Sequence, residues 1–347
     1  MHWPQQKSVG SSSFFAQGTS KDKLPPPDPQ IVAQPVVLTT VTNASVYFSG
    51  GRHVVTTNNG TVISRCRISN TRLAEIPWQT HKHLVGTSLI LGDSAGASNY
   101  YHWMLDLMPK LGYLAKIGIN LDSIDHFLVR DAKTLFHIES LKKLGIDESR
   151  IVETAQQPHL SCDSVLVLPL KHQINMSMHP FVPNWVNSTF NDAVTNDKEK
   201  IKLYLKRAEG GRRGIKNQEA VESLLLEKGF SIVEINGLSI AEQAHLLNRA
   251  KVIVSPHGAT LTNLVFAQPG AKVIELFGTH VFPYYYGLSN LCNLEYHALL
   301  QKPADYAKLV QIQTALEFGS AKNQNITQYQ EFSVNLIALG NAITACS

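Results

Sequence analysis

Residues 201–277 alternate between short apolar runs and amphipathic segments of helical length, and this pattern limits the possible folds more than any other feature. It predicts strands at 201–205, 230–235, 252–254 and 272–277, with helices between them at 218–228, 239–249 and 259–266. Strands separated by helices of this length form parallel βαβ units, whose ligands bind beyond the carboxyl ends of the strands. We therefore expect an α/β domain built on a parallel sheet, with a ligand site at that edge.

The preceding part of the chain predicts a second α/β domain. Short β-rich runs between residues 31 and 92 are broken by Gly-Gly and Asn-Asn-Gly turns, and helical and strand-like segments alternate from 100 to 168. A chain of 347 residues is longer than one core usually grows. We expect a disordered tail at 1–30, domains at 31–196 and 197–300, and a helical segment at 301–347 that packs back on the first domain.

Composition excludes some classes of protein. The net charge is +4 and Lys and Arg are scattered, which argues against a nucleic-acid partner. No apolar run could span a bilayer, and the N-terminus has no signal-like apolar segment. Four separated cysteines, Cys66, Cys162, Cys292 and Cys346, indicate reduced thiols. These features predict a cytoplasmic protein, with peripheral membrane association left open.

The stretch Ser-Pro-His-Gly-Ala-Thr-Leu-Thr-Asn at 255–263 follows a predicted strand and begins a predicted helix. Gly258 permits close backbone approach, and the unpaired N–H groups of a helix N-terminus attract phosphate. His257 can add a hydrogen bond, and Thr260 or Thr262 a hydroxyl. By itself this turn is equally compatible with a packing role for Gly258 and a capping role for His257.

Arginines follow the strand at 201–205. Arg207 comes first, and a glycine-rich loop then carries Arg212 and Arg213 at the same sheet edge. Guanidinium groups bind phosphate oxygens in two-point geometry, so this loop favours a pyrophosphate site over a solvated charge run.

A third motif is Asn-Tyr-Tyr-His-Trp-Met-Leu-Asp at 99–106. If this segment is helical, His102 and Asp106 lie on one face, a suitable pair for proton transfer or acceptor binding. A structural hydrogen bond in an aromatic core helix is the alternative.

Together these motifs resemble glycosyltransferase family 61, which includes extracellular O-GlcNAc, protein O-mannose GlcNAc and plant xylosyl transferases. The resemblance rests on residues 99–106, 204–219 and 256–277, and covers neither the first thirty residues nor those beyond about Tyr286. It implies a GT-B-like fold, two Rossmann-like domains facing a cleft, with an acceptor-side domain first and a nucleotide-sugar-binding domain second. It also implies inverting transfer from a nucleotide sugar, commonly a UDP-sugar.

The resemblance further implies roles for individual residues. Those implied to bind the donor are Arg207, Arg212, Arg213, His257, Gly258, Ala259, Thr260, Thr262, Asn263 and Glu275, of which Glu275 would accept hydrogen bonds from ribose. The chain departs from the family pattern at Lys206, which replaces a usual Ser or Gly, and at Thr260, which replaces a Gly and adds bulk near the phosphate.

The predicted mechanism pairs leaving-group stabilisation by the arginines with base or acceptor contacts from His102 and Asp106. No Asp-x-Asp motif occurs in the sequence, so we expect no cofactor and metal-independent transfer to a glycan, lipid-linked glycan or protein. A bacterial-type cytoplasmic enzyme would fit these features. A non-catalytic nucleotide- or glycan-binding module is the alternative, whereas a dinucleotide oxidoreductase is disfavoured because Gly-x-Gly-x-x-Gly is missing.

Overall fold

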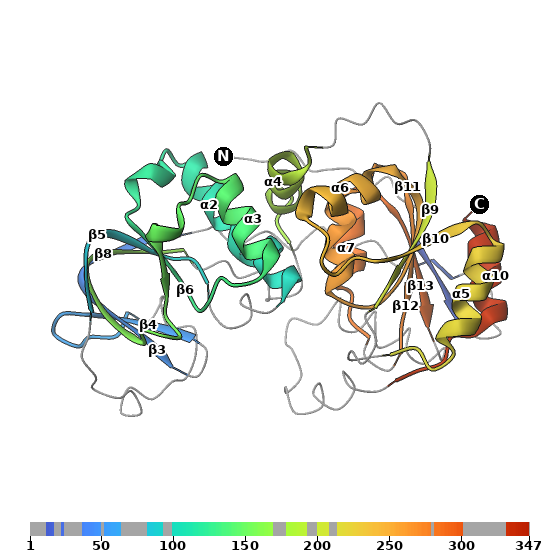
Figure 1. Ribbon diagram of the computed structural model, residues 1–347, viewed down its shortest axis with the longest axis horizontal. Helices are drawn as coiled ribbons and strands as arrows, with labels where there is room; N and C mark the ends of the chain where they lie inside the picture. Colours follow the sequence, from blue (N-terminus) through green and yellow to red (C-terminus); the bar gives the residue numbers. More distant parts are fainter. Residues whose placement is uncertain are drawn as a thin grey trace. The chain divides into compact units, whose positions relative to one another are not determined.

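The computed structural model describes residues 12–16, 22–23, 37–49, 52–63, 82–92, 99–168, 178–192, 200–207, 214–278, 281–300 and 331–346. The chain forms two compact units, Gln34–Lys171 and the combination of Met1–Ala33 with His172–Ser347. Each unit contains a largely parallel sheet with helices (Figure 1), so the predicted α/β class is confirmed. The predicted cleft between two domains stays a prediction.

The unit Gln34–Lys171 has a six-stranded sheet in the order β4-β3-β8-β5-β6-β7. Strands β5, β6, β7 and β8 run parallel, while β3 is antiparallel to β4 and β8. The strands are β3 (Thr39–Ser49), β4 (Arg52–Thr57), β5 (Lys82–Ile90), β6 (His126–Val129), β7 (Ile151–Glu153) and β8 (His159–Val167). The helical elements are η3 (His102–Leu107), α2 (Met108–Lys116), η4 (Leu121–Ser123), α3 (Leu135–Lys143) and η5 (Glu148–Arg150).

The second unit has a seven-stranded sheet in the order β10-β9-β11-β12-β13-β1-β2. All neighbours are parallel except β1 and β2. The strands are β1 (Ser12–Ala16), β2 (Asp22–Lys23), β9 (Ile201–Lys206), β10 (Phe230–Glu234), β11 (Ala250–Pro256), β12 (Lys272–Leu276) and β13 (Glu295–Leu300). The helical elements are α4 (Phe181–Phe190), α5 (Gln218–Glu227), α6 (Ile240–Arg249), η6 (Ala259–Phe266), α7 (Tyr284–Leu291) and α10 (Leu336–Ala345).

The βαβ alternation predicted for residues 201–277 is therefore present. Helix α6 begins with a capping box, in which Ser239 and Glu242 satisfy each other's backbone N–H groups, and this sequence signal locates its start. The predicted helix at 259–266 is a tighter 3₁₀ helix, η6.

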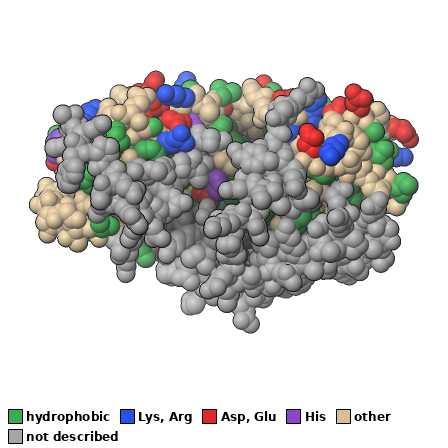
Figure 2. All heavy atoms as spheres, turned by 90° about the horizontal axis from the view of Figure 1, so that it is seen from below, with side chains coloured by type: hydrophobic (Ala, Val, Ile, Leu, Met, Phe, Trp, Pro, Cys, Tyr) green, Lys and Arg blue, Asp and Glu red, His purple; other side chains and the backbone are tan. Residues whose placement is uncertain are grey.

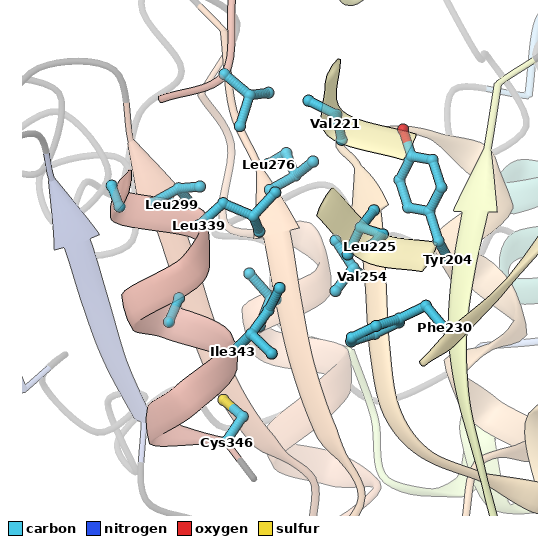
Figure 3. Close-up of a cluster of buried hydrophobic side chains, with 14 of the residues drawn as sticks. Tyr204, Val221, Leu225, Phe230, Val254, Leu276, Leu299, Leu339, Ile343 and Cys346 are labelled. Atoms are coloured by element: carbon cyan, nitrogen blue, oxygen red, sulfur yellow. The ribbon is translucent and has the colours of Figure 1, made fainter. Parts of the chain in front are cut away.

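Helices α5 and α10 share one hydrophobic core with the sheet of this unit (Figure 3). Leu225 of α5 and Leu339 and Ile343 of α10 are buried against strand residues that include Tyr204 and Val254. The C-terminal helix was predicted to pack back on the first domain, and the structure corrects this prediction. The apolar face of α10 is buried in its own unit instead.

Two further predictions differ from the structure. Within the predicted tail, Ser12–Ala16 forms β1, which pairs with β13 and so satisfies backbone groups that an edge strand would expose. The predicted boundary at residue 196 contrasts with a division at Lys171/His172, because α4 packs on η6 and α6.

Both acidic and basic side chains occur among the described residues on one face of the protein (Figure 2). On the face seen in Figure 2, blue and red side chains of the described residues alternate without a large patch of either sign. Within the described part of the chain, no helix is both long enough and apolar enough to cross a membrane.

Candidate functional site

The turn after β11 forms the centre of the first candidate site. The His257 N–H donates to the carbonyl of Leu276 at 2.9 Å, which holds the turn against the end of the neighbouring strand β12. Gly258 then begins η6 in an extended conformation. Ala259 and Thr260 are partly exposed, so this end of η6 reaches the surface.

Arg207 lies against this turn. It follows β9, the strand next to β11, and its Nη1 donates to the His257 carbonyl oxygen at 3.0 Å. The guanidinium also lies over Gly258, where a Cβ atom, if one were added, would be 3.1 to 3.2 Å from Arg207 atoms. The structure thus brings together the two motifs that the carboxyl-end rule assigned to one sheet edge.

His257 is bonded to a buried carboxylate. Its Nδ1 lies 2.5 Å from Oε1 of Glu275, and the His257 side chain is only 6% exposed. The Tyr296 hydroxyl donates to the other oxygen of Glu275. Glu275 has no exposed surface, so a ribose could not reach it in this structure, and its predicted role as a ribose acceptor is corrected. From the sequence alone, Glu275 was expected at a strand end where it binds ribose, and Tyr296 was not identified.

Aromatic rings surround the His257 imidazole. Phe277 stacks on it with ring centroids 5.1 Å apart, and Tyr285 approaches edge-on at 5.5 Å. Tyr284 lies parallel to it at 6.4 Å and is partly exposed. These contacts restrict rotation of the imidazole ring.

The remaining predicted donor residues are divided between surface and interior. Asn263 is fully buried and donates to Gln243 Oε1 at 2.9 Å, so it attaches η6 to α6 rather than facing a ligand. Thr262 is also buried, with 1% exposure. Both residues lie on the buried face of η6. The spacing of residues in the motif did not reveal which of them would be buried. Arg212 and Arg213 lie outside the described residues.

The second candidate site is the His102–Asp106 pair in the other unit. Their Nδ1 and Oδ2 atoms are 2.6 Å apart, and the side chains are 25% and 15% exposed. The expected helical segment is present, but residues 102–107 form a π-helix in which the Met108 N–H donates to the Trp103 carbonyl. Pro109 follows and lacks an N–H, which weakens regular α-helical bonding at this point.

Packing fixes this π-helix on α3. The indole N–H of Trp103 donates to Ser140 Oγ at 2.8 Å, and Trp103 is 1% exposed. Asn99 Oδ1 accepts from the N–H of Tyr101 at 2.9 Å and so caps the segment. Short π-helical insertions are frequent at functional sites. This one carries the partly exposed His102, whose Nδ1 is held by the Asp106 carboxylate.

Among the described residues, no group of three or more His, Cys, Asp or Glu side chains could hold a metal ion.

Comparison with known proteins assigns a family to these motifs. A family model described as glycosyltransferase 61 matches residues 100–274, slightly more than half of the chain. A β-1,2-xylosyltransferase from rice, Oryza sativa subsp. japonica, is 33% identical over 99 residues. That alignment covers 27% of this chain and 18% of the rice protein, so the chain spans under a fifth of the length of this relative.

The comparison corrects the predicted location. A bacterial-type cytoplasmic enzyme was expected, but the relative that matches is a xylosyltransferase from a plant. The expectation was wrong because it rested on the residues at the start of the chain and on the wide separation of the cysteines, and neither identifies a compartment.

Proposed function

Because the chain belongs to the glycosyltransferase 61 family, we propose that it transfers a sugar from a nucleotide-sugar donor to a hydroxyl group. The proposed acceptor is a glycan, a lipid-linked glycan or a protein. The proposed donor is a UDP-sugar, with UDP-xylose first, since the rice relative is named a xylosyltransferase. The observation that carries the proposal is the position of Arg207 against the His257–Gly258 turn at the carboxyl ends of parallel strands.

In this proposal the turn binds the donor diphosphate. Arg207 supplies a permanent positive charge and N–H donors, and the partly exposed start of η6, Ala259 and Thr260, supplies backbone contacts. Charge accumulates on the diphosphate as the bond to the sugar breaks. Donors that are already in place stabilise that charge without reorganisation, which lowers the barrier.

His102 is the proposed general base. Asp106 accepts from Nδ1–H, so Nε2 is the ring nitrogen that would take the proton from the acceptor hydroxyl. The acceptor oxygen then forms a bond to the anomeric carbon while the bond from that carbon to the diphosphate oxygen breaks. Attack from the side opposite the leaving group gives inversion. The family model spans both motifs, which supports assigning them to one reaction.

Metal-independent transfer is part of the proposal. The cationic Arg207 would balance the leaving-group charge that a divalent ion balances in other transferases. Turnover that is lost in EDTA and restored by manganese would contradict this part.

The first experiment measures UDP release from UDP-xylose, UDP-GlcNAc and UDP-glucose by mass spectrometry, without and with simple glycoside acceptors. Wild-type protein is compared with Arg207→Ala and with Arg130→Ala, whose side chain is 40% exposed in the other unit. We expect release from one donor, lost in Arg207→Ala and kept in Arg130→Ala. If none of the donors is cleaved or bound, this result favours the alternative function, a non-catalytic nucleotide- or glycan-binding module.

A further inference from the structure

Two hydrogen bonds connect His257, Glu275 and Tyr296. Glu275 and Tyr296 lie on the neighbouring strands β12 and β13, and His257 lies in the turn that follows β11. Strands β11, β12 and β13 are parallel neighbours, and their register pairs Ser255 with Glu275 and Val273 with Tyr296. Residues paired in register face the same side of a sheet, and so do residues two apart along a strand. Glu275 and Tyr296 therefore share one face, on which His257 continues the row two residues after Ser255.

The hydrogen bond between Tyr296 and Glu275 joins a protonated tyrosine to a buried carboxylate. Burial, and then the neighbouring Glu275 carboxylate, raise the pKa of Tyr296 well above its usual value. Tyr296 thus keeps its proton at neutral pH and donates a hydrogen bond to Glu275. A carboxylate with no exposed surface is costly unless donors surround it, and this hydrogen bond offsets part of that cost.

The hydrogen bond from Tyr296 also sets the direction of the carboxylate. With one oxygen of Glu275 held by the tyrosine hydroxyl, the other points at Nδ1 of His257 at 2.5 Å. A carboxylate acceptor at this position requires the hydrogen of the imidazole to be on Nδ1.

We propose that Glu275 and Tyr296 are positioning residues for His257. They fix its ring orientation and keep the hydrogen on Nδ1, so that Nε2 presents a lone pair and accepts a hydrogen bond from a hydroxyl group of the donor nucleotide. The identity of this ligand rests on the proposed function, whereas the tautomer and its dependence on Tyr296 do not. Glu275 acts through His257 and does not itself touch the donor.

The test uses protein labelled with ¹⁵N-histidine, in which two-bond couplings show which ring nitrogen carries hydrogen. The His257 signal is identified as the one missing from His257→Gln. We expect wild-type His257 to show a protonated Nδ1, and Tyr296→Phe to shift this signal or mix the tautomers. Tyr204→Phe is the matched control, since Tyr204 is equally buried in the same sheet but its hydroxyl bonds to Gln218.

A second readout is the dissociation constant for UDP, measured by titration calorimetry. We expect Tyr296→Phe to weaken binding by about fivefold, the effect of one misplaced hydrogen bond, and Tyr204→Phe to leave it unchanged. An unprotonated Nδ1 in wild-type protein, or a His257 signal unaffected by Tyr296→Phe, would overturn the inference. If UDP does not bind wild-type protein, the proposed donor is wrong, and the tautomer measurement still decides the role of Tyr296.

Discussion

The guanidinium of Arg207 lies so close to Gly258 that a single added methyl group would touch it. A Cβ at Gly258 would be 3.1 Å from Nη2 and 3.2 Å from Cζ and Nη1. The backbone of Gly258 is extended rather than left-handed, so the requirement for glycine here comes from the arginine and not from the torsion angles. The two motifs, separated by about fifty residues, are therefore matched in shape.

Gly258→Ala should reduce donor affinity more than stability. The added methyl group displaces the flexible end of Arg207 by a few tenths of an ångström, and we expect UDP binding to weaken on the order of tenfold because the phosphate donors are misaligned. Calorimetric titration with UDP checks this. Gly340→Ala is the control, since nothing lies within 4 Å of its added Cβ in α10. It should stabilise the protein by about 0.5–1 kcal/mol and leave UDP affinity unchanged.

His102→Ala should lower kcat by roughly 10²- to 10⁴-fold with little change in KM for the donor, because it removes the proposed base. Asp106→Asn should cost less, about 10- to 100-fold, since the imidazole stays while its orientation loosens. Rates are measured with the donor that wild-type protein cleaves. His83→Ala is the control, because His83 forms a comparable but exposed pair with Asp163 at 3.0 Å. Equal losses in His83→Ala and His102→Ala would contradict a specific role for His102.

Arg207→Lys separates charge from geometry. Lysine keeps one positive charge but lacks the planar fork. Its three donors share a single nitrogen, so it cannot hold the His257 carbonyl and also offer a phosphate the flat two-point geometry of a guanidinium. We expect an intermediate UDP affinity, above Arg207→Ala and below wild type, measured at low and high salt. If lysine fully restores binding, the site senses charge alone and the close packing on Gly258 has no functional role.

The sequence predicts the features that depend on periodicity. Regular alternation located the strands and helices of residues 201–277, and the carboxyl-end rule was enough to place Arg207 beside His257. Contacts that depend on strand register and burial were not predictable in this way. The bond of Glu275 to His257 crosses between strands, and Tyr296 lies on a strand beyond the regular pattern.

Backbone hydrogen bonding and terminal packing were also not predictable from residue patterns. Residue spacing does not distinguish a π-helix from an α-helix at His102, although Pro109 was a visible signal. The polar composition of the N-terminal residues concealed the short run Ser12–Ala16, whose pairing depends on an edge strand far away in sequence.

His53 should limit stability in mild acid. It is fully buried on β4, and its Nε2 lies 2.9 Å from Oγ1 of Thr154, whose own hydroxyl donates to the Val129 carbonyl. The ring is therefore a neutral Nε2–H donor. Burial, and then the charge of Lys110, lower the pKa of His53 from 6.5 to about 3.

Because its pKa is lowered by folding, His53 makes the folded protein less stable in acid. The unfolded chain binds a proton at His53 below about pH 6.5 and the folded chain does not, so stability falls as pH drops from 6.5 towards 3. One such group costs about 1.4 kcal/mol per pH unit in that window. His53→Gln keeps an N–H donor for Thr154 but cannot be protonated, so its unfolding free energy should fall less steeply than that of wild type between pH 6.5 and 5. Urea unfolding at several pH values measures this slope, with His245→Gln on the exposed side of α6 as control. Equal slopes in the wild-type and His53→Gln proteins would show that His53 is protonated without loss of the fold.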